Sequence, residues 1–323
     1  MTLVVGYKSA LEYWRCVGPR YLGTTRRRRS AVQKANRTLL SGESPILTEG
    51  NLRPAGCQLP LHVVVGSPSQ RVRSKKLISH VSTSKMLASS YVNAGDDFVV
   101  ASPELCFLQL ASSLSLEHLI QVGYELCGTY ALQANSSAIF REKPLTSVSR
   151  IAAFVHDSER VQGRKKALRA LKYIQDNSAS PRETILAMLL TLPYALGGYG
   201  ITQPNLNYRV EIPQTAKNKV DRAFYVLDIC WPKAKFCLEY DSAQYHLNPA
   251  QQEADARKRN ALEALGYAVF TVSPGQISDS GSFNRVAKQV AHHLGKRLRY
   301  KDPEFTRRHL VLREVLMQER CSE

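Results

Sequence analysis

The sequence predicts an α/β protein in which helices flank a central mixed sheet, joined to an N-terminal, mostly helical α+β region. Three observations support this prediction. Apolar residues make up 44% and charged residues 22% of the 323 residues, which is a globular composition. Beyond residue 180, segments with strand periodicity alternate with segments of helical periodicity, and this order produces a sheet covered by helices. The polar linker Asn177–Ser180 separates the two parts.

Residues 1–76 are expected to form a basic, irregular N-terminal segment. Arg26–Arg29 is an arginine run for which a solvated arm and a phosphate-binding arm are both reasonable interpretations. Leu61–Gly66 has the composition of one short strand. A complete helix-turn-helix pattern is not recognisable in this segment.

Residues 77–177 are expected to form a helical region. The sequence Ser102-Pro103-Glu104 indicates a helix start, because it provides a capping serine, a proline at the first helical position and an acid in the first turn. A second helix is expected over Leu116–Leu126, and a basic helix over Arg164–Tyr173. The first residues of the basic helix are candidate nucleic-acid contacts: Arg164, Lys165 and Lys166.

The chain is strongly basic, with a net charge of +17 and a pI near 9.7. Such a charge favours a polyanionic partner, of which nucleic acid is the commonest, although RNA-binding proteins and proteins that bind anionic membranes are also basic. No membrane association is expected, because the most apolar run, Ile185–Leu196, is short and contains Pro193. The N-terminus lacks the pattern of a signal peptide, which predicts a cytoplasmic location. The seven cysteines include no CxxC pair, which predicts reduced thiols and neither disulfides nor a zinc site.

The C-terminal region is expected to be one domain over residues 178–301, followed by a C-terminal helix over residues 302–323. It begins with a helix over Glu183–Leu196. Three strands, a helix, a strand and a helix are expected to follow, over residues 208–212, 224–230, 235–241, 249–265, 267–272 and 282–299.

Two acids are expected to lie opposite each other on the second and third of these strands. A hairpin centred between Lys233 and Ala234 pairs Asp228 with Glu239, which places their β-carbons about 5 Å apart. Apolar residues are expected to share the other face of the first strand: Leu227, Ile229 and Trp231. Two such carboxylates repel each other unless a cation lies between them, and oxygen ligands suit Mg²⁺ or Mn²⁺. A solvated face with ordinary surface acids is the alternative interpretation.

The surrounding sequence adds a series of motifs at fixed spacing. An Asp lies in a strand that ends at Trp-Pro, and a stretch of the form E-x-D-S-x-x-x-H follows. A helix with an Asp and a Leu, and a strand of the form Gly-Tyr-x-Val, complete the series. The residues that carry it are Asp228, Trp231, Pro232, Glu239, Asp241, His246, Asp255, Leu262 and Gly266.

These motifs resemble those of restriction-endonuclease-like proteins of the PD-(D/E)XK superfamily that are related to the very-short-patch mismatch-repair endonucleases. In that family a Gly usually stands where this chain has Ser242, and an Arg where it has Lys258. The resemblance covers about 120 residues. It implies a metal-dependent DNA endonuclease in which Asp228 and Glu239 bind the metal ion.

The resemblance also implies an acid on the first helix of the core, and Glu183 stands at that position. The same residue fits a capping box with Ser180, and both roles are compatible. The usual lysine two places after the Glu of the motif is replaced here by Asp241, which stays a candidate acid of the site. His246 and Lys258 are the candidates to replace the lysine, the former by acid–base catalysis or phosphate orientation. A plain surface histidine is the alternative interpretation of His246.

Further basic residues of the helix over 249–265 are candidate DNA contacts: Arg257, Lys258 and Arg259. Lys258 lies one helical turn from Asp255, so a surface ion pair between them is the simpler expectation.

The N-terminal half resembles a second group of proteins, less closely. The stretch Ala101–Ala111, the segment Gly123–Gly128 and the basic helix are similar to the region that precedes the nuclease-like module in bacterial proteins related to abortive-infection antitoxins. Those proteins act as DNA-binding regulators.

Two functions therefore follow from the sequence. The first is a DNA endonuclease or nickase, favoured by retention of the acids. The second is a non-catalytic, antitoxin-like DNA-binding regulator on a nuclease-derived fold, favoured by the absence of the usual lysine. Serine hydrolases and P-loop enzymes are not supported, because neither GxSxG nor GxxxxGK[ST] occurs.

Overall fold

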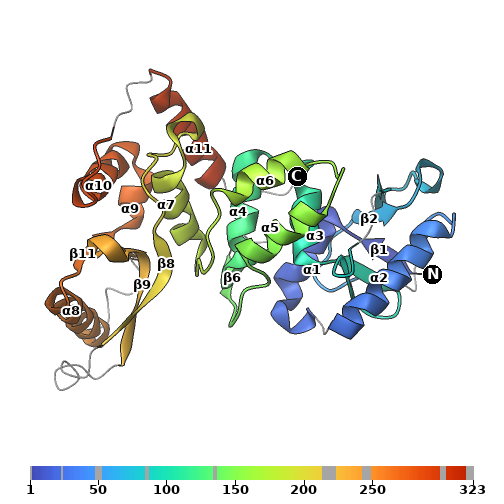
Figure 1. Cartoon of the computed structure of the whole chain (residues 1–323), viewed down its shortest axis with the longest axis horizontal. Helices are drawn as coiled ribbons and strands as arrows, with labels where there is room; N and C mark the ends of the chain where they lie inside the picture. The colour runs from blue at the N-terminus through green and yellow to red at the C-terminus, as the bar shows by residue number, and fades with distance from the viewer. Residues whose placement is uncertain are drawn as a thin grey trace. The chain divides into compact units, whose positions relative to one another are not determined.

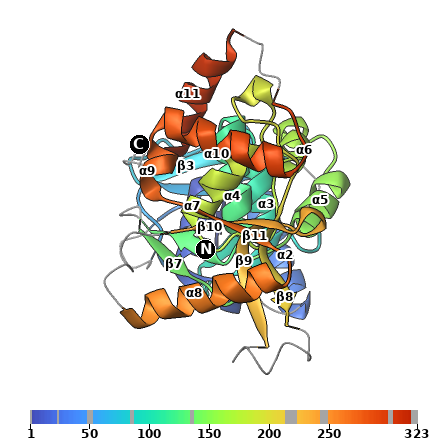
Figure 2. The same ribbon diagram turned by 90° about the vertical axis from the view of Figure 1, so that its left-hand side faces the viewer.

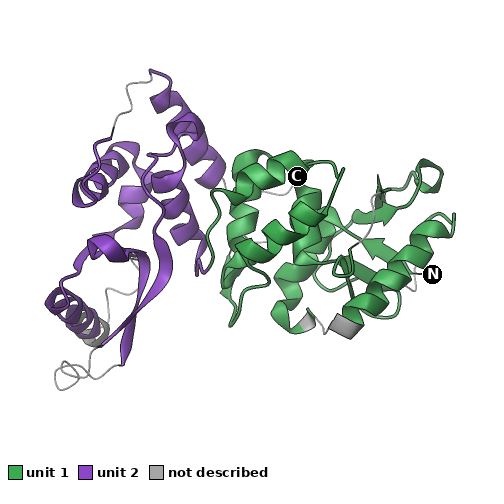
Figure 3. Ribbon diagram, in the orientation of Figure 1, with its two compact units in different colours: residues 1–176 green, residues 177–323 purple. Residues whose placement is uncertain are grey.

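The structure is a computed structural model that describes residues 2–22, 25–47, 53–83, 87–133, 137–212, 223–241, 249–298 and 303–317. The chain divides into two compact units, Met1–Asp176 and Asn177–Glu323 (Figure 3). Each unit contains a mixed sheet with helices packed against it, so the expected α/β class is confirmed at this level. Among the described residues, no helix is long and apolar enough to cross a membrane.

Unit 1 is built on a five-stranded sheet with the order β3-β2-β1-β5-β4 (Figure 1). Its strands are β1 (Leu3–Val5), β2 (Leu61–Val65), β3 (Leu77–Val81), β4 (Tyr91–Asn93) and β5 (Phe98–Ala101). The first two helices are α1 (Tyr7–Val17) and α2 (Thr25–Leu40). The expectation of an irregular segment over residues 1–76 is therefore wrong, although the strand expected at residues 61–66 is present as β2. A three-residue strand such as β1 has no recognisable period, and its partners lie far away in the sequence.

The remainder of unit 1 is mainly helical. It contains α3 (Pro103–Leu110), α4 (Leu116–Cys127), α5 (Val148–Asp157) and α6 (Arg164–Leu171), with a two-stranded ribbon of β6 (Tyr130–Leu132) and β7 (Ala138–Phe140). The cap of α3 is as expected, because the Ser102 hydroxyl accepts a hydrogen bond from the Leu105 backbone N–H at 3.3 Å. The five-stranded sheet takes strands from both sides of residue 76, so it joins the two N-terminal segments that the sequence suggested.

Unit 2 contains a four-stranded sheet with the order β11-β10-β9-β8 (Figures 1 and 2). The strands are β8 (Asn205–Glu211), β9 (Phe224–Trp231), β10 (Phe236–Tyr240) and β11 (Ala268–Val272). The helices are α7 (Pro181–Thr191), α8 (Pro249–Ala264), α9 (Pro274–Ser278), α10 (Ser280–His293) and α11 (Phe305–Met317). Helix α7 packs beside β9, and α8 packs beside β11.

Helix α11 belongs to the same unit as the sheet, although the sequence suggested a separate C-terminal helix. His309 is buried and donates from Nδ1 to the carbonyl oxygen of Gly197 at 2.7 Å. The rings of Tyr199 and Phe305 pack around it. These contacts fix α11 against the turn that follows α7.

The expected register of the β9–β10 hairpin is confirmed for its three paired positions. Trp231 pairs with Phe236, Cys230 with Cys237, and Ile229 with Leu238. The turn over Pro232–Ala234 closes through Lys235, which has a left-handed φ of 46°.

The expected side-chain alternation along β9 is wrong for Leu227. This residue packs in one apolar cluster with Cys230, Cys237 and Leu262 of α8, whereas strict alternation would place Leu227 and Cys230 on opposite faces. The interruption coincides with Asn207 on the neighbouring strand, whose φ is 46°. The faces of the β8–β9 ribbon therefore exchange near Asp228.

Candidate functional site

Asp228 and Glu239 lie where strands β9 and β10 stop pairing with each other. The last paired positions are Ile229 and Leu238. One residue further along, the backbone N–H of Tyr240 donates to Oδ2 of Asp228 at 2.8 Å. The charge of Asp228 raises the pKa of Glu239, and the backbone of Asp228 acts in the opposite direction. Asp228 is thus held by the backbone of the neighbouring strand, and its charge acts directly on Glu239.

Lys258 joins these acids from helix α8. Its Nζ donates to Oε2 of Glu239 at 2.7 Å, and the two side chains are 24% and 20% exposed. A half-buried ion pair of this kind is more constrained than an ordinary surface pair. The sequence favoured a surface pair between Lys258 and Asp255, but the structure places Lys258 in the carboxylate cluster.

Glu183 contributes a third acid from the first turn of α7. The Ser180 hydroxyl accepts from the Glu183 backbone N–H at 3.1 Å, which is the expected helix cap. The Glu183 carboxylate accepts from the Ala179 N–H at 2.9 Å and from Nδ2 of Asn207 at 2.7 Å. The charge of Asp228 also raises the pKa of Glu183. Glu183 therefore caps the helix and faces the other acids at the same time.

Burial raises the pKa of all three acids. For Glu239, burial and then the charge of Asp228 raise the pKa to about 7, against the opposing effect of Lys258. For Glu183, burial and then the charge of Asp228 also raise the pKa to about 7. Burial likewise raises the pKa of Asp228, although the Tyr240 N–H and Lys258 act in the opposite direction. Each of these acids therefore keeps its proton to a higher pH than an exposed acid does.

Two carboxylates of this cluster are the kind of oxygen ligand that a hard divalent cation prefers. Oε1 of Glu239 is buried and has no hydrogen-bond partner, which leaves an unsatisfied carboxylate oxygen beside Asp228. Within the described ranges, no three His, Cys, Asp or Glu side chains are grouped so that they could hold a metal ion. Asp228 and Glu239 would accordingly supply two carboxylates, as is common for Mg²⁺, which keeps several water ligands.

The other candidate site residues are less closely tied to this cluster. The backbone N–H of Asp241 donates to the Val272 carbonyl oxygen at 3.1 Å, which continues the β10–β11 pairing. His246 lies outside the described residues. Arg257 and Arg259 are exposed on α8, and Arg257 forms an ion pair with Glu253 at 3.6 Å.

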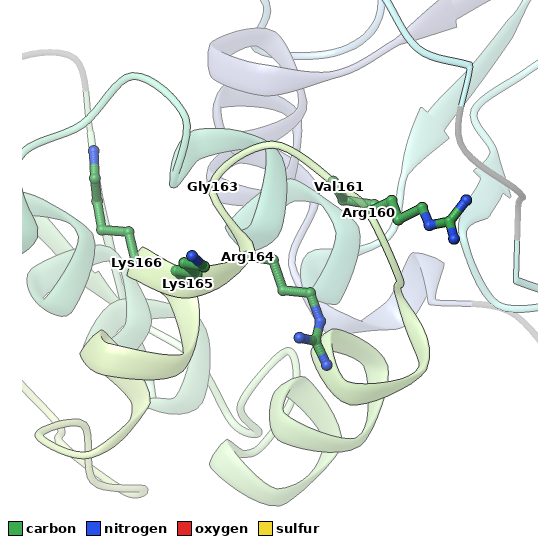
Figure 4. A pocket seen from close by; sticks show the side chains of 6 residues that line it. All are labelled: Arg160, Val161, Gly163, Arg164, Lys165 and Lys166. Carbon is green, nitrogen blue, oxygen red and sulfur yellow. The ribbon is translucent and has the colours of Figure 1, made fainter.

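The basic residues at the start of α6 point in different directions (Figure 4). Arg164 donates from Nε to the Val155 carbonyl oxygen at 2.9 Å and from Nη2 to that of His156 at 3.2 Å. Lys166 donates to the Leu114 carbonyl oxygen at 2.7 Å. Two of the three candidate nucleic-acid contacts thus have structural partners, whereas Lys165 is exposed.

Asn207 is the site residue that the sequence did not suggest. Its side chain links the Glu183 carboxylate to the carbonyl oxygen of Asn177, at 2.7 and 2.8 Å. An Asn inside a strand is unusual, and its tolerance of left-handed backbone was the available signal.

No protein-family model, curated protein or solved structure matches this chain. Function is therefore inferred from the chemistry of the site itself.

Proposed function

We propose that unit 2 is a metal-dependent DNA endonuclease or nickase of the restriction-endonuclease type, which hydrolyses phosphodiester bonds. The observation that carries this proposal is the convergence of three acids and a lysine from four separate elements. Glu183 comes from α7, Asp228 from β9, Glu239 from β10 and Lys258 from α8. The three acids are far apart in the sequence, and their negative charges repel one another. The fold brings them together at a cost in stability that a function would explain.

The acids would hold Mg²⁺ or Mn²⁺ through Asp228 and Glu239, the latter through its unsatisfied Oε1. A divalent cation at such a site lowers the pKa of a water molecule and stabilises charge on the phosphate oxygens. Glu183 is placed to accept a proton, since its pKa is close to neutral. Asn207 holds the Glu183 carboxylate in position.

Lys258 supplies the positive charge that the E-x-K lysine provides in related nucleases. Asp241 occupies that lysine's position, so the charge has to come from another element. The Lys258 ammonium already lies on Oε2 of Glu239, within reach of a phosphate held beside the acids. Its expected role is to stabilise negative charge that develops during cleavage.

The proposal is tested by incubating the purified full chain with supercoiled DNA in Mg²⁺, Mn²⁺ or EDTA. Wild-type protein should relax or linearise the DNA in the presence of a metal ion and leave it intact in EDTA. Asp228→Asn and Glu239→Gln should abolish cleavage. The control is Glu263→Gln, which alters an exposed acid on α8 and should cleave as the wild type does. Metal-dependent cleavage that survives Asp228→Asn would exclude this site from the reaction.

A second candidate function is a non-catalytic DNA-binding regulator on the same fold. One observation favours it: Lys258 already neutralises one oxygen of Glu239, as a resident cation would. A regulator of this kind should bind DNA equally well in EDTA and in Mg²⁺, without cleavage. Its thermal stability should also be unchanged by divalent ions, whereas binding of Mg²⁺ to the native site would raise it.

A further inference from the structure

Arg209 lies on β8 just beyond the carboxylates. It is two residues from Asn207, the partner of Glu183, and it pairs with Val226, which is two residues from Asp228. At about 3.4 Å per residue, the backbone of Arg209 is therefore about 7 Å along the ribbon from the level of Asp228. The ribbon continues past the site as an exposed edge that carries this arginine.

The guanidinium of Arg209 is held by two neighbours, an aromatic ring on which it stacks and an acid to which it donates. Its carbon lies 3.7 Å from the ring centroid of Phe224, and its Nε donates to Oε1 of Glu211 at 2.6 Å. The register places Glu211 opposite Phe224, so the three side chains form one unit, which we call the Arg209 platform. Stacking on an aromatic ring limits the rotation of a long side chain that is otherwise 55% exposed.

The two terminal nitrogens form the outer edge of the Arg209 guanidinium. Glu211 bonds to Nε, and the described residues provide no partner for the two terminal nitrogens. Those two nitrogens form the fork that binds a phosphate in two parallel hydrogen bonds. Phe224 is 37% exposed, so the ring on which the guanidinium stacks lies at the surface of the ribbon.

We propose that the Arg209 platform binds a phosphodiester of the DNA backbone, one or two nucleotides from the bond placed at the carboxylates. This inference rests on the proposed function, since it names a neighbouring contact to the same substrate. Phosphates of one strand are spaced about 3.4 Å apart along the helix axis, so a separation of about 7 Å corresponds to one or two nucleotides. Arg209 is then a positioning residue that sets which phosphate reaches Asp228 and Glu239.

The test is a DNA-binding titration of the full chain in EDTA, which prevents cleavage, at several salt concentrations. Arg209→Ala should weaken DNA binding about three- to tenfold. It should also reduce the magnitude of the slope of log affinity against log salt concentration by about 1. The matched control is Arg307→Ala. Arg307 also donates from Nε to a neighbouring acid, Glu304, at 2.6 Å, and is 70% exposed, but it lies on α11 away from the acids.

A second measurement locates the contact on the DNA. A methylphosphonate, which removes one phosphate charge, is placed at each position in turn along a short duplex. One position should weaken wild-type binding as much as Arg209→Ala does, and should have no further effect on the variant. Phe224→Ala should reproduce part of the Arg209→Ala loss, while thermal denaturation shows that the fold is retained.

The outcomes separate the two proposals. Wild-type binding with Arg209→Ala indistinguishable from Arg307→Ala would overturn the platform and leave the nuclease proposal intact. Binding that depends on Arg209 without any cleavage in metal ions would support the platform and favour the regulator. A wild-type protein that does not bind DNA would overturn both.

Discussion

The ammonium of Lys258 lies 2.7 Å from Oε2 of Glu239, although 19 positions separate the two residues in the sequence. Strand β10 provides the carboxylate and helix α8 provides the ammonium group. The pairing places a positive charge among the acids, which the proposed nuclease function requires because Asp241 stands at the position of the lysine in the E-x-K motif.

Substitution of this lysine should therefore affect chemistry more than DNA binding. Lys258→Met removes the donor that the proposed function places beside the phosphate, and it should lower the cleavage rate by roughly 10²–10³-fold, as loss of one preorganised donor does in other enzymes. Cleavage of supercoiled DNA at saturating enzyme measures this loss. Lys288→Met, which removes an exposed lysine of α10, serves as the control and should leave the rate unchanged. Equal rates for the two variants would contradict the role assigned to Lys258.

Affinity for the divalent ion should rise with pH between about 6 and 8. The metal ligands must be deprotonated, and the pKa of Glu239 is raised to about 7 by burial and by Asp228. Below that value, affinity is expected to fall about tenfold per pH unit, because one proton has to leave for each ion bound. Calorimetric titration with Mg²⁺ or Mn²⁺ in two buffers of different ionisation enthalpy measures both the affinity and the proton release. Affinity that is constant over this range would mean that Glu239 is not a ligand.

Glu183 should make the metal-free protein less stable at high pH. Its pKa is raised from 4.5 to about 7, so its contribution to stability is present below pH 4.5 and is lost as the pH rises through about 7. A shift of this size corresponds to a free energy on the order of 3 kcal/mol. Glu183→Gln cannot ionise and should lose less stability between pH 5 and pH 8 than the wild type does.

Thermal denaturation in EDTA at the two pH values measures this difference. Glu263→Gln, an exposed acid on α8, should follow the wild type at both. If Glu183→Gln showed the same pH dependence as the wild type, the raised pKa of Glu183 would not be a source of the instability.

Local patterns in the sequence were sufficient for the C-terminal hairpin. The register of β9 and β10 follows from the turn length, and the helix cap at Ser180 follows from residues three apart. The position of Lys258 did not follow, because spacing within a helix shows that Asp255 is near but not which strand the helix covers. Likewise, alternation alone does not reveal the left-handed Asn207 that moves Leu227 to the other face.

The N-terminal sheet was missed for a different physical reason. Strand β1 has three residues, and its pairing with β5 joins Leu3 to Phe98, a contact that no local pattern encodes. The Arg26–Arg29 run also drew attention to charge, whereas α2 as a whole is a helix with a buried side that includes Ala31 and Ala35.

The start of α6 should separate structural from binding roles among adjacent basic residues. Arg164 donates to the carbonyl oxygens of Val155 and His156 at the end of α5, so Arg164→Ala removes both hydrogen bonds. Each lost bond is expected to cost about 0.5–1.5 kcal/mol of stability. Lys165 is exposed, so Lys165→Ala should leave stability unchanged. It should reduce the magnitude of the slope of log DNA affinity against log salt concentration by about 1. Denaturant unfolding and DNA titration of both variants measure the two effects. If Lys165→Ala bound DNA with an unchanged salt slope, α6 would not be part of the DNA-binding surface.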